Sequence, residues 1–200
     1  MAALFEETGR FIAMKTVLKR WRGNDANALM YGAGHGGFEA AAVLGVSMIS
    51  NIVIAVMINT GTSGLITDKL TGDAASQINA AFDTLITTQP HMFLVGIAER
   101  LFAVTLQIAL SVLVWTAVKK KGMRFLFPVA IFIHFAVDAA TVVIASKSIF
   151  ASEAVVFVMS AATAFLSYFV WKRCRLGVNG AEVQNDIDTE TGDLLQEGEK

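Results

Sequence analysis

Four long apolar stretches limit the fold of this 200-residue chain more than any other feature. Each runs for at least 18 residues and contains at most two ionisable side chains. About 20 such residues cross the ~30 Å hydrocarbon core of a bilayer as an α-helix, whereas a membrane β-barrel would show strands of about ten residues with alternating polarity. The pattern predicts an all-α, polytopic transmembrane helical bundle with its long segments at Gly36–Ile58, Met92–Val118, Phe125–Ala145 and Ala154–Trp171.

The composition excludes several other classes of protein. Hydrophobic residues make up 54% of the chain and charged residues only 16%, against roughly 25% charged in soluble domains. The formal net charge of −1 leaves no broad cationic surface for nucleic acid. Cys174 is the single cysteine, so an intramolecular disulfide and a CxxC motif are both excluded. The lipid bilayer is therefore the expected environment.

A fifth segment, Met1–Met14, has helical spacing but is too short to cross the membrane alone. Glu6 and Glu7 stand where a signal peptide would have its apolar core. We therefore interpret this segment as part of the bundle, which then has about five membrane segments.

Lysine and arginine gather in three clusters, and the two loops between those clusters are poor in them. By the positive-inside rule the clusters face the cytoplasm, which makes the C-terminus cytoplasmic. The first segment then runs inward, and Met1 begins near or within the outer leaflet. We therefore expect the first membrane segment to be N-terminally truncated, with upstream helices missing. The clusters are residues 15–22, 119–124 and 172–175.

Two stretches lie outside the predicted membrane segments. The extracytoplasmic loop 59–89 contains apolar residues at helical spacing, and Asp73 is placed to cap the start of a helix. That helix could rest on the bundle or act as a lid, and the first interpretation is the plainer one. Residues 176–200 are acidic and predict a disordered cytoplasmic tail. The predicted domains are thus a membrane bundle over 1–175 and this tail.

Ionisable residues inside the apolar segments are the candidates for chemistry, because a charge at mid-bilayer costs roughly 2.5–3.5 kcal/mol on insertion scales. At about 1.5 Å per helical residue, Glu6 lies ~13 Å, His134 ~15 Å and Gln107 ~18 Å from the nearest cytoplasmic cluster. Three polar residues on three helices are therefore predicted to converge near one depth.

Spacing of i,i+4 places pairs of these side chains on one helix face. Arg10 is predicted to hold the Glu6 carboxylate, with Glu7 directed about 100° away. Asp138 is predicted to accept the imidazole N–H of His134. His35 has the same relation to a further glutamate, Glu39, and the glycines around it allow close helix packing.

Two kinds of site fit these residues, and the spacing does not choose between them. One is a general base with oxyanion donors, and the other is a His/His/Glu zinc site with an open position. The plain alternative is that His134 is a packing residue and that the Glu6–Arg10 pair is structural. Likewise, Glu99 and Arg100 form either an internal ion pair or charges that reach a polar cavity.

Three motifs in this order carry a resemblance to a known family. They are EETGR at Glu6–Arg10, an aromatic residue followed by a histidine at Tyr31 and His35, and HxxxD at His134–Asp138. The chain resembles the CAAX protease and bacteriocin-processing (CPBP) family of intramembrane proteases. The GxGHGGxE stretch around His35 and the Glu99–Arg100 pair are similar to its bacterial YhfC-like branch. Gln107 stands where relatives are expected to carry a histidine.

The resemblance implies a helical bundle with a polar cavity inside the membrane, in which a peptide bond is hydrolysed. It implies that Glu6 activates water, assisted by Glu7 or His35. It implies that His134 and Asp138 stabilise the oxyanion and that Arg10 holds the acidic pair. Where a metal takes part, the expected ion is Zn²⁺ and the expected ligands are His35, His134 and Glu6.

The sequence therefore predicts an intramembrane peptidase of the bacterial plasma membrane, acting on a membrane-associated peptide or protein. The alternative is a non-catalytic membrane scaffold or immunity-type protein that binds a peptide partner. A weaker third hypothesis is a carrier of protons or small solutes along the Glu and His side chains.

Overall fold

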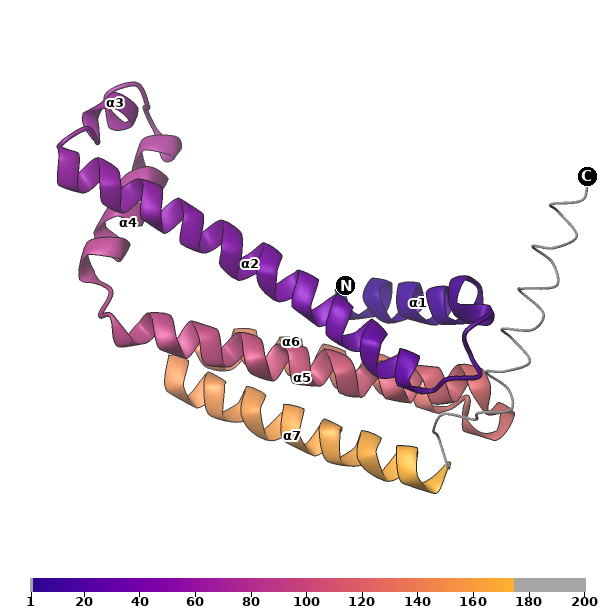
Figure 1. Cartoon of the computed structure of the whole chain (residues 1–200). Helices are drawn as coiled ribbons and strands as arrows, with labels where there is room; N and C mark the ends of the chain where they lie inside the picture. Colours follow the sequence, from indigo (N-terminus) through magenta and orange to yellow (C-terminus); the bar gives the residue numbers. More distant parts are fainter. Residues whose placement is uncertain (1, 175–200) are drawn as a thin grey trace, which may run out of the picture. The chain divides into compact units, whose positions relative to one another are not determined.

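A computed structural model describes residues 2–174, and these residues fold into α-helices joined by short connections (Figure 1). The acidic tail predicted at 176–200 lies outside the described residues. Short 3₁₀ turns follow the first helix and precede the sixth. The helices are α1 (Ala2–Lys15), α2 (Ala26–Thr60), α3 (Gly64–Thr67), α4 (Asp73–Thr87), α5 (His91–Lys119), α6 (Leu126–Ala145) and α7 (Ile149–Arg173).

Within residues 2–174, four helical stretches are long and apolar enough to cross a membrane: Ala26–Thr60, His91–Lys119, Lys121–Ala145 and Ile149–Arg173. The predicted all-α, polytopic bundle is thus confirmed. The helix α2 begins ten residues before the predicted run Gly36–Ile58, because its first turns carry polar and small residues that interrupt apolarity without interrupting the helix. Its 35 residues span about 52 Å, which exceeds the ~30 Å hydrocarbon core.

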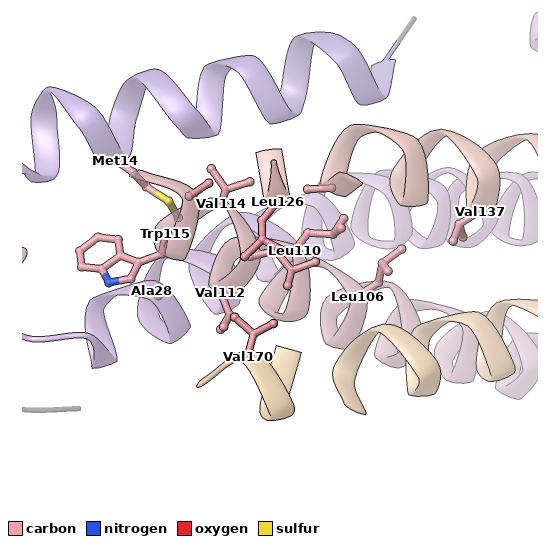
Figure 2. Packing of buried hydrophobic residues seen from close by; sticks show 13 residues of the cluster. Met14, Ala28, Leu106, Leu110, Val112, Val114, Trp115, Leu126, Val137 and Val170 are labelled. Carbon is pink, nitrogen blue, oxygen red and sulfur yellow. The ribbon is translucent and has the colours of Figure 1, made fainter. Parts of the chain in front are cut away.

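The described residues divide into two compact units, residues 2–37 with 101–174, and residues 38–100. In the first unit, α5 is the central helix. Nine consecutive residues, from Ala109 to Ala117, are buried, as expected for a helix that is covered on all sides. Figure 2 shows this core, in which Leu110, Val114 and Trp115 of α5 lie among Met14 of α1 and Leu126 of α6.

A buried carboxylate fixes the entry into α2. Asp25 is 1% exposed, and its Oδ1 accepts a 2.6 Å hydrogen bond from the Trp115 indole and a 2.9 Å bond from the Lys119 ammonium. Two donors compensate for the burial of this charge. The start of α2 is therefore anchored to the end of α5.

Glycines allow α2 to approach α5 closely. A Cβ at Gly32 would lie 2.5 Å from the Ile108 Cα, and a Cβ at Gly36 would lie 2.9 Å from the Gln107 Cβ. The two glycines are four residues apart, so they form one small-xxx-small contact face. The predicted close packing around His35 is present at these two positions.

The inner face of α7 is a stripe of small polar residues. Ser167 donates a 2.8 Å hydrogen bond to the Ala109 carbonyl of α5, and Ser152 donates a 3.3 Å bond to the Thr141 carbonyl of α6. Such side chains let membrane helices pack closely and bond across the interface. The buried residues of this face are Ser152, Val156, Ser160, Thr163, Ser167 and Val170.

The second unit contains the outer part of α2, the short α3, all of α4 and the start of α5. The helix predicted within loop 59–89 is α4, with Phe82 buried on its inner face. The prediction that Asp73 caps α4 was wrong. The N-cap is Gly72 at φ 62°, a left-handed conformation that favours glycine. Asp73 lies in the first turn, where its negative charge interacts favourably with the positive end of the helix dipole.

Candidate active site

The centre of the first unit contains a buried ion pair between neighbouring turns of α1. The Arg10 Nη1 donates to both carboxylate oxygens of Glu7 at 2.9 Å, and both side chains are fully buried. The sequence predicted that Arg10 would hold Glu6. The i,i+3 partner is bound instead, because Glu7 is the glutamate that turns into the bundle, where a buried charge requires a counter-charge.

Glu7 also binds His134, which lies on α6. The Glu7 Oε1 lies 2.8 Å from the His134 Nδ1, and His134 is 5% exposed. An ionised carboxylate only accepts hydrogen bonds, so this contact places a proton on Nδ1, and in the neutral imidazole the lone pair is then on Nε2. The predicted acceptor, Asp138, lies 3.8 Å from Nε2, which is beyond a hydrogen bond. That prediction was wrong because Glu7, from another helix, takes the N–H.

Glu6 faces a more open part of the same site. Its Oε2 lies 3.4 Å from the His35 Nε2 and 3.8 Å from the His134 Nε2. The side chains of Glu6 and His35 are about 30% exposed, and the Tyr31 ring stacks on the His35 ring at a centroid distance of 6.2 Å. Two imidazole nitrogens therefore lie near one carboxylate oxygen of a partly exposed side chain.

Gln107 of α5 connects the two glutamates. Its Oε1 accepts a hydrogen bond from the Arg10 Nη2, and its Nε2 donates to the Glu6 Oε2 at 3.4 Å. The structure thus brings together the three residues that the depth argument placed near one level, Glu6, Gln107 and His134. Gln107 was absent from the predicted site residues, although its position within an apolar segment was a signal for it.

The five residues Glu6, Glu7, Arg10, Gln107 and His134 are called the polar network below. His35 and Asp138 lie at its exposed edge, with the Asp138 side chain 47% exposed. All six predicted site residues are therefore located in one region of the first unit.

Two pairs of donor atoms at this exposed edge have about the spacing of ligands on one divalent metal ion, and Glu6 is a member of both pairs. Ligands at 2.0–2.2 Å in a tetrahedral zinc site lie about 3.3–3.5 Å from one another. The Glu6 Oε2 lies 3.4 Å from one histidine Nε2 and 3.8 Å from the other, close to that spacing. The carboxylate of Glu7 on the far nitrogen of His134 is the outer partner that metal-binding histidines usually have.

A separate set of charges lies in the second unit. Arg100 contacts the Glu99 carboxylate, and its Nη1 lies 3.9 Å from the Glu39 Oε1. Glu99 and Arg100 also line a cavity of about 290 Å³ together with Ser47 and Asn51 of α2. Both sequence interpretations of this pair therefore hold, since it is an ion pair and it reaches a partly polar cavity.

Comparison with known proteins gives two matches. Residues 1–160 match the family model described as YhfC intramembrane metalloprotease. The chain is also similar to "Uncharacterized membrane protein YhfC" of Bacillus subtilis (strain 168), with 34% identity over 179 residues. That alignment covers 88% of this chain and 67% of the relative. No solved structure matches the chain significantly.

Proposed function

The chain belongs to the YhfC intramembrane metalloprotease family, and we propose that it is a membrane-embedded endopeptidase that hydrolyses a peptide bond in a membrane-associated peptide or protein. The observation that supports this most is the position of the Glu6 Oε2 at 3.4 and 3.8 Å from two imidazole nitrogens. Membership of the wider CPBP family, a location in the bacterial plasma membrane and a cytoplasmic C-terminus belong to the same proposal.

Three side chains hold the metal in this proposal, namely Glu6, His35 and His134. A bound Zn²⁺ would supply the Lewis acidity that polarises the scissile carbonyl and makes water a better nucleophile at neutral pH. The chain's own contribution is to prepare the ligand atoms. Glu7 keeps the proton of His134 on Nδ1, so that Nε2 carries its lone pair toward the site.

The partial exposure of the ligands is what a catalytic site requires. Structural zinc sites are closed by four protein ligands, whereas catalytic sites keep one position for water or substrate. Glu6 and His35 are about 30% exposed, while His134 is held from the buried side. A peptide can then approach from the exposed edge.

Asp138 is the proposed general base, because its exposed carboxylate lies 3.8 Å from the His134 Nε2. It accepts a proton from the attacking water, whose oxygen forms the new bond to the carbonyl carbon. It then returns that proton to the amide nitrogen as the C–N bond breaks. The oxyanion role that the resemblance implies for Asp138 would need the protonated acid, whereas the general-base role uses the ionised carboxylate.

The test is zinc binding and proteolysis by the purified protein in detergent micelles, with fluorescently labelled casein as the protease probe. We expect about one zinc per chain, lost in Glu6→Gln, His35→Ala and His134→Ala together with cleavage. Asp83→Asn, an exposed carboxylate of α4, is the matched control and should keep both properties.

Two outcomes would contradict the proposal. Zinc binding that is unaffected by Glu6→Gln would remove the metal site. The wild-type protein could also bind zinc but cleave neither casein nor transmembrane peptides. If it then retains a bound peptide partner, the non-catalytic scaffold is favoured.

A further inference from the structure

Gln107 is the one member of the polar network without an acidic or basic group, and its side chain lies between Glu6 and the Arg10 guanidinium that holds Glu7. Glu7 is fully buried and paired with Arg10, whereas Glu6 is about one-third exposed beside His35. Gln107 itself is 3% exposed. Its amide contacts Arg10 on one side and Glu6 on the other.

The orientation of this amide follows from its neighbours. A guanidinium has donors only, so the group that faces Arg10 must be the carbonyl oxygen Oε1. The amide nitrogen then points the other way, and an ionised Glu6 can only accept from it. Arg10 thus fixes the Gln107 amide so that it donates to Glu6.

Helix packing holds the side chain in this position. The Cβ that Gly36 lacks would lie 2.9 Å from the Gln107 Cβ and 3.3 Å from its Cγ, so α2 lies directly against the stem of the glutamine. Gly32, one turn earlier, lets the same helix approach the Ile108 backbone. The glutamine stem is therefore confined by backbone rather than by flexible side chains.

We propose that Gln107 is a positioning residue that directs the Glu6 carboxylate toward the two histidine Nε2 atoms and keeps it distinct from Glu7. Two adjacent glutamates on α1 would otherwise compete for Arg10. The Arg10 Nη1 binds Glu7 and its Nη2 binds the Gln107 carbonyl, whereas the contacts of the Glu6 Oε2 are with the Gln107 amide nitrogen and the two histidines. This proposal rests on the proposed metal site, for which Glu6 is a ligand.

The main experiment measures Zn²⁺ affinity by chelator competition for Gln107→Glu in detergent micelles. The variant keeps the side-chain shape and still accepts from Arg10, but it places a carboxylate rather than a donor against Glu6. We expect Zn²⁺ affinity to fall 10- to 100-fold, the usual loss when an outer partner of a metal ligand is removed. Ser111→Ala, a buried position one turn along α5 and outside the polar network, should stay within about threefold of wild type.

A second measurement reads the Gln107–Glu6 contact without any metal. In the double variant Glu6→Gln/Gln107→Glu, the donor and the acceptor exchange places and the hydrogen bond can form again. Without metal, we expect the melting temperature of the double variant to fall by less than the sum of the decreases in the two single variants. Zn²⁺ affinity should not return, because the carboxylate has left position 6.

The outcomes separate the two proposals. Additive losses of melting temperature, or a Gln107→Glu variant that binds Zn²⁺ as tightly as Ser111→Ala does, would overturn the role of Gln107. If the decreases in melting temperature are not additive but the wild-type protein binds no Zn²⁺, the metal site is overturned, while the positioning of Glu6 by Gln107 is supported.

Discussion

Each of the two compact units contains an arginine paired with glutamate, and the two differ in how completely the paired charges are buried. In the first unit, Arg10 is 1% exposed and binds Glu7 through two 2.9 Å bonds, with Gln107 as a further acceptor. In the second, the Arg100 side chain is 19% exposed, and one of its two carboxylate partners, Glu39, lies at 3.9 Å.

The comparison separates charges that depend on a buried partner from charges that water in a cavity can stabilise. Removing one partner of a fully buried ion pair leaves an unpaired charge without water, whereas a pair that lines a cavity can be hydrated instead. The same residue types at similar helical spacing therefore have different consequences. The sequence patterns around the two arginines are alike, so only the burial of the side chains distinguishes the two sets of charges.

The largest expected effect is on catalysis, and it should distinguish two partly exposed carboxylates, one in each unit. Asp138 lies 3.8 Å from the His134 Nε2, while Glu99 belongs to the second unit and pairs with Arg100. We expect Asp138→Asn to slow proteolysis about 10²- to 10⁴-fold, the range for loss of a general base. Glu99→Gln should leave the rate unchanged. The measurement is the initial rate of casein cleavage at saturating Zn²⁺.

An Asp138→Asn variant that keeps its rate would show that the two carboxylates are equivalent and that proton transfer occurs elsewhere. Zinc affinity of the same variant is the control, since a general base that is not a ligand should leave it unchanged.

The next effect is on stability. Glu7→Gln leaves the buried Arg10 charge without its counter-charge and weakens the bond to His134. We expect the free energy of unfolding to fall by about 3–5 kcal/mol, as for other broken buried pairs. The measurement is denaturant unfolding in micelles, or the yield of folded protein where the loss is too large. A loss below about 1 kcal/mol, typical of exposed pairs, would contradict the distinction between the units.

Much of the fold could be predicted because apolar length alone determines a membrane helix. The run Met92–Val118 lies within one residue of the observed α5 at both ends, and Phe125–Ala145 ends where α6 ends. The predicted run Ala154–Trp171 begins five residues after the observed start of α7 at Ile149, because the charged Glu153 interrupts the apolar sequence but not the helix. Its N-cap is Ser148, whose side chain accepts a bond from the Ala151 N–H.

The pairing within the site could be predicted only in part. Depth along each helix brought Glu6, Gln107 and His134 together, since that estimate depends only on helical rise. The choice of Glu7 as the partner of Arg10 and His134 depends on how α1 is rotated against α6. Both i,i+3 and i,i+4 partners lie within reach on a helix surface, so spacing cannot decide between adjacent glutamates.

A moderate effect is expected where α2 lies against Gln107. Gly32→Ala places a Cβ 2.5 Å from the Ile108 Cα, and the two backbones must separate. We expect a loss of about 1–3 kcal/mol in the free energy of unfolding, as for other overpacked sites. Gly34→Ala on the same helix meets nothing within 4 Å and is the matched control. It should be neutral or gain up to about 1 kcal/mol, because alanine is the better helix former. Equal effects at the two glycines would contradict the close contact.

The smallest effect is expected from the charges of the second unit. Glu99→Gln keeps the shape of the side chain and leaves Arg100 with Glu39 and with the cavity lined by Ser47 and Asn51. Because the arginine can be hydrated there, we expect the free energy of unfolding to change by less than about 1 kcal/mol. Denaturant unfolding beside Glu7→Gln measures this directly. A loss as large as that of Glu7→Gln would mean that Arg100 is as dependent on its carboxylates as Arg10 is, and that the cavity does not hydrate it.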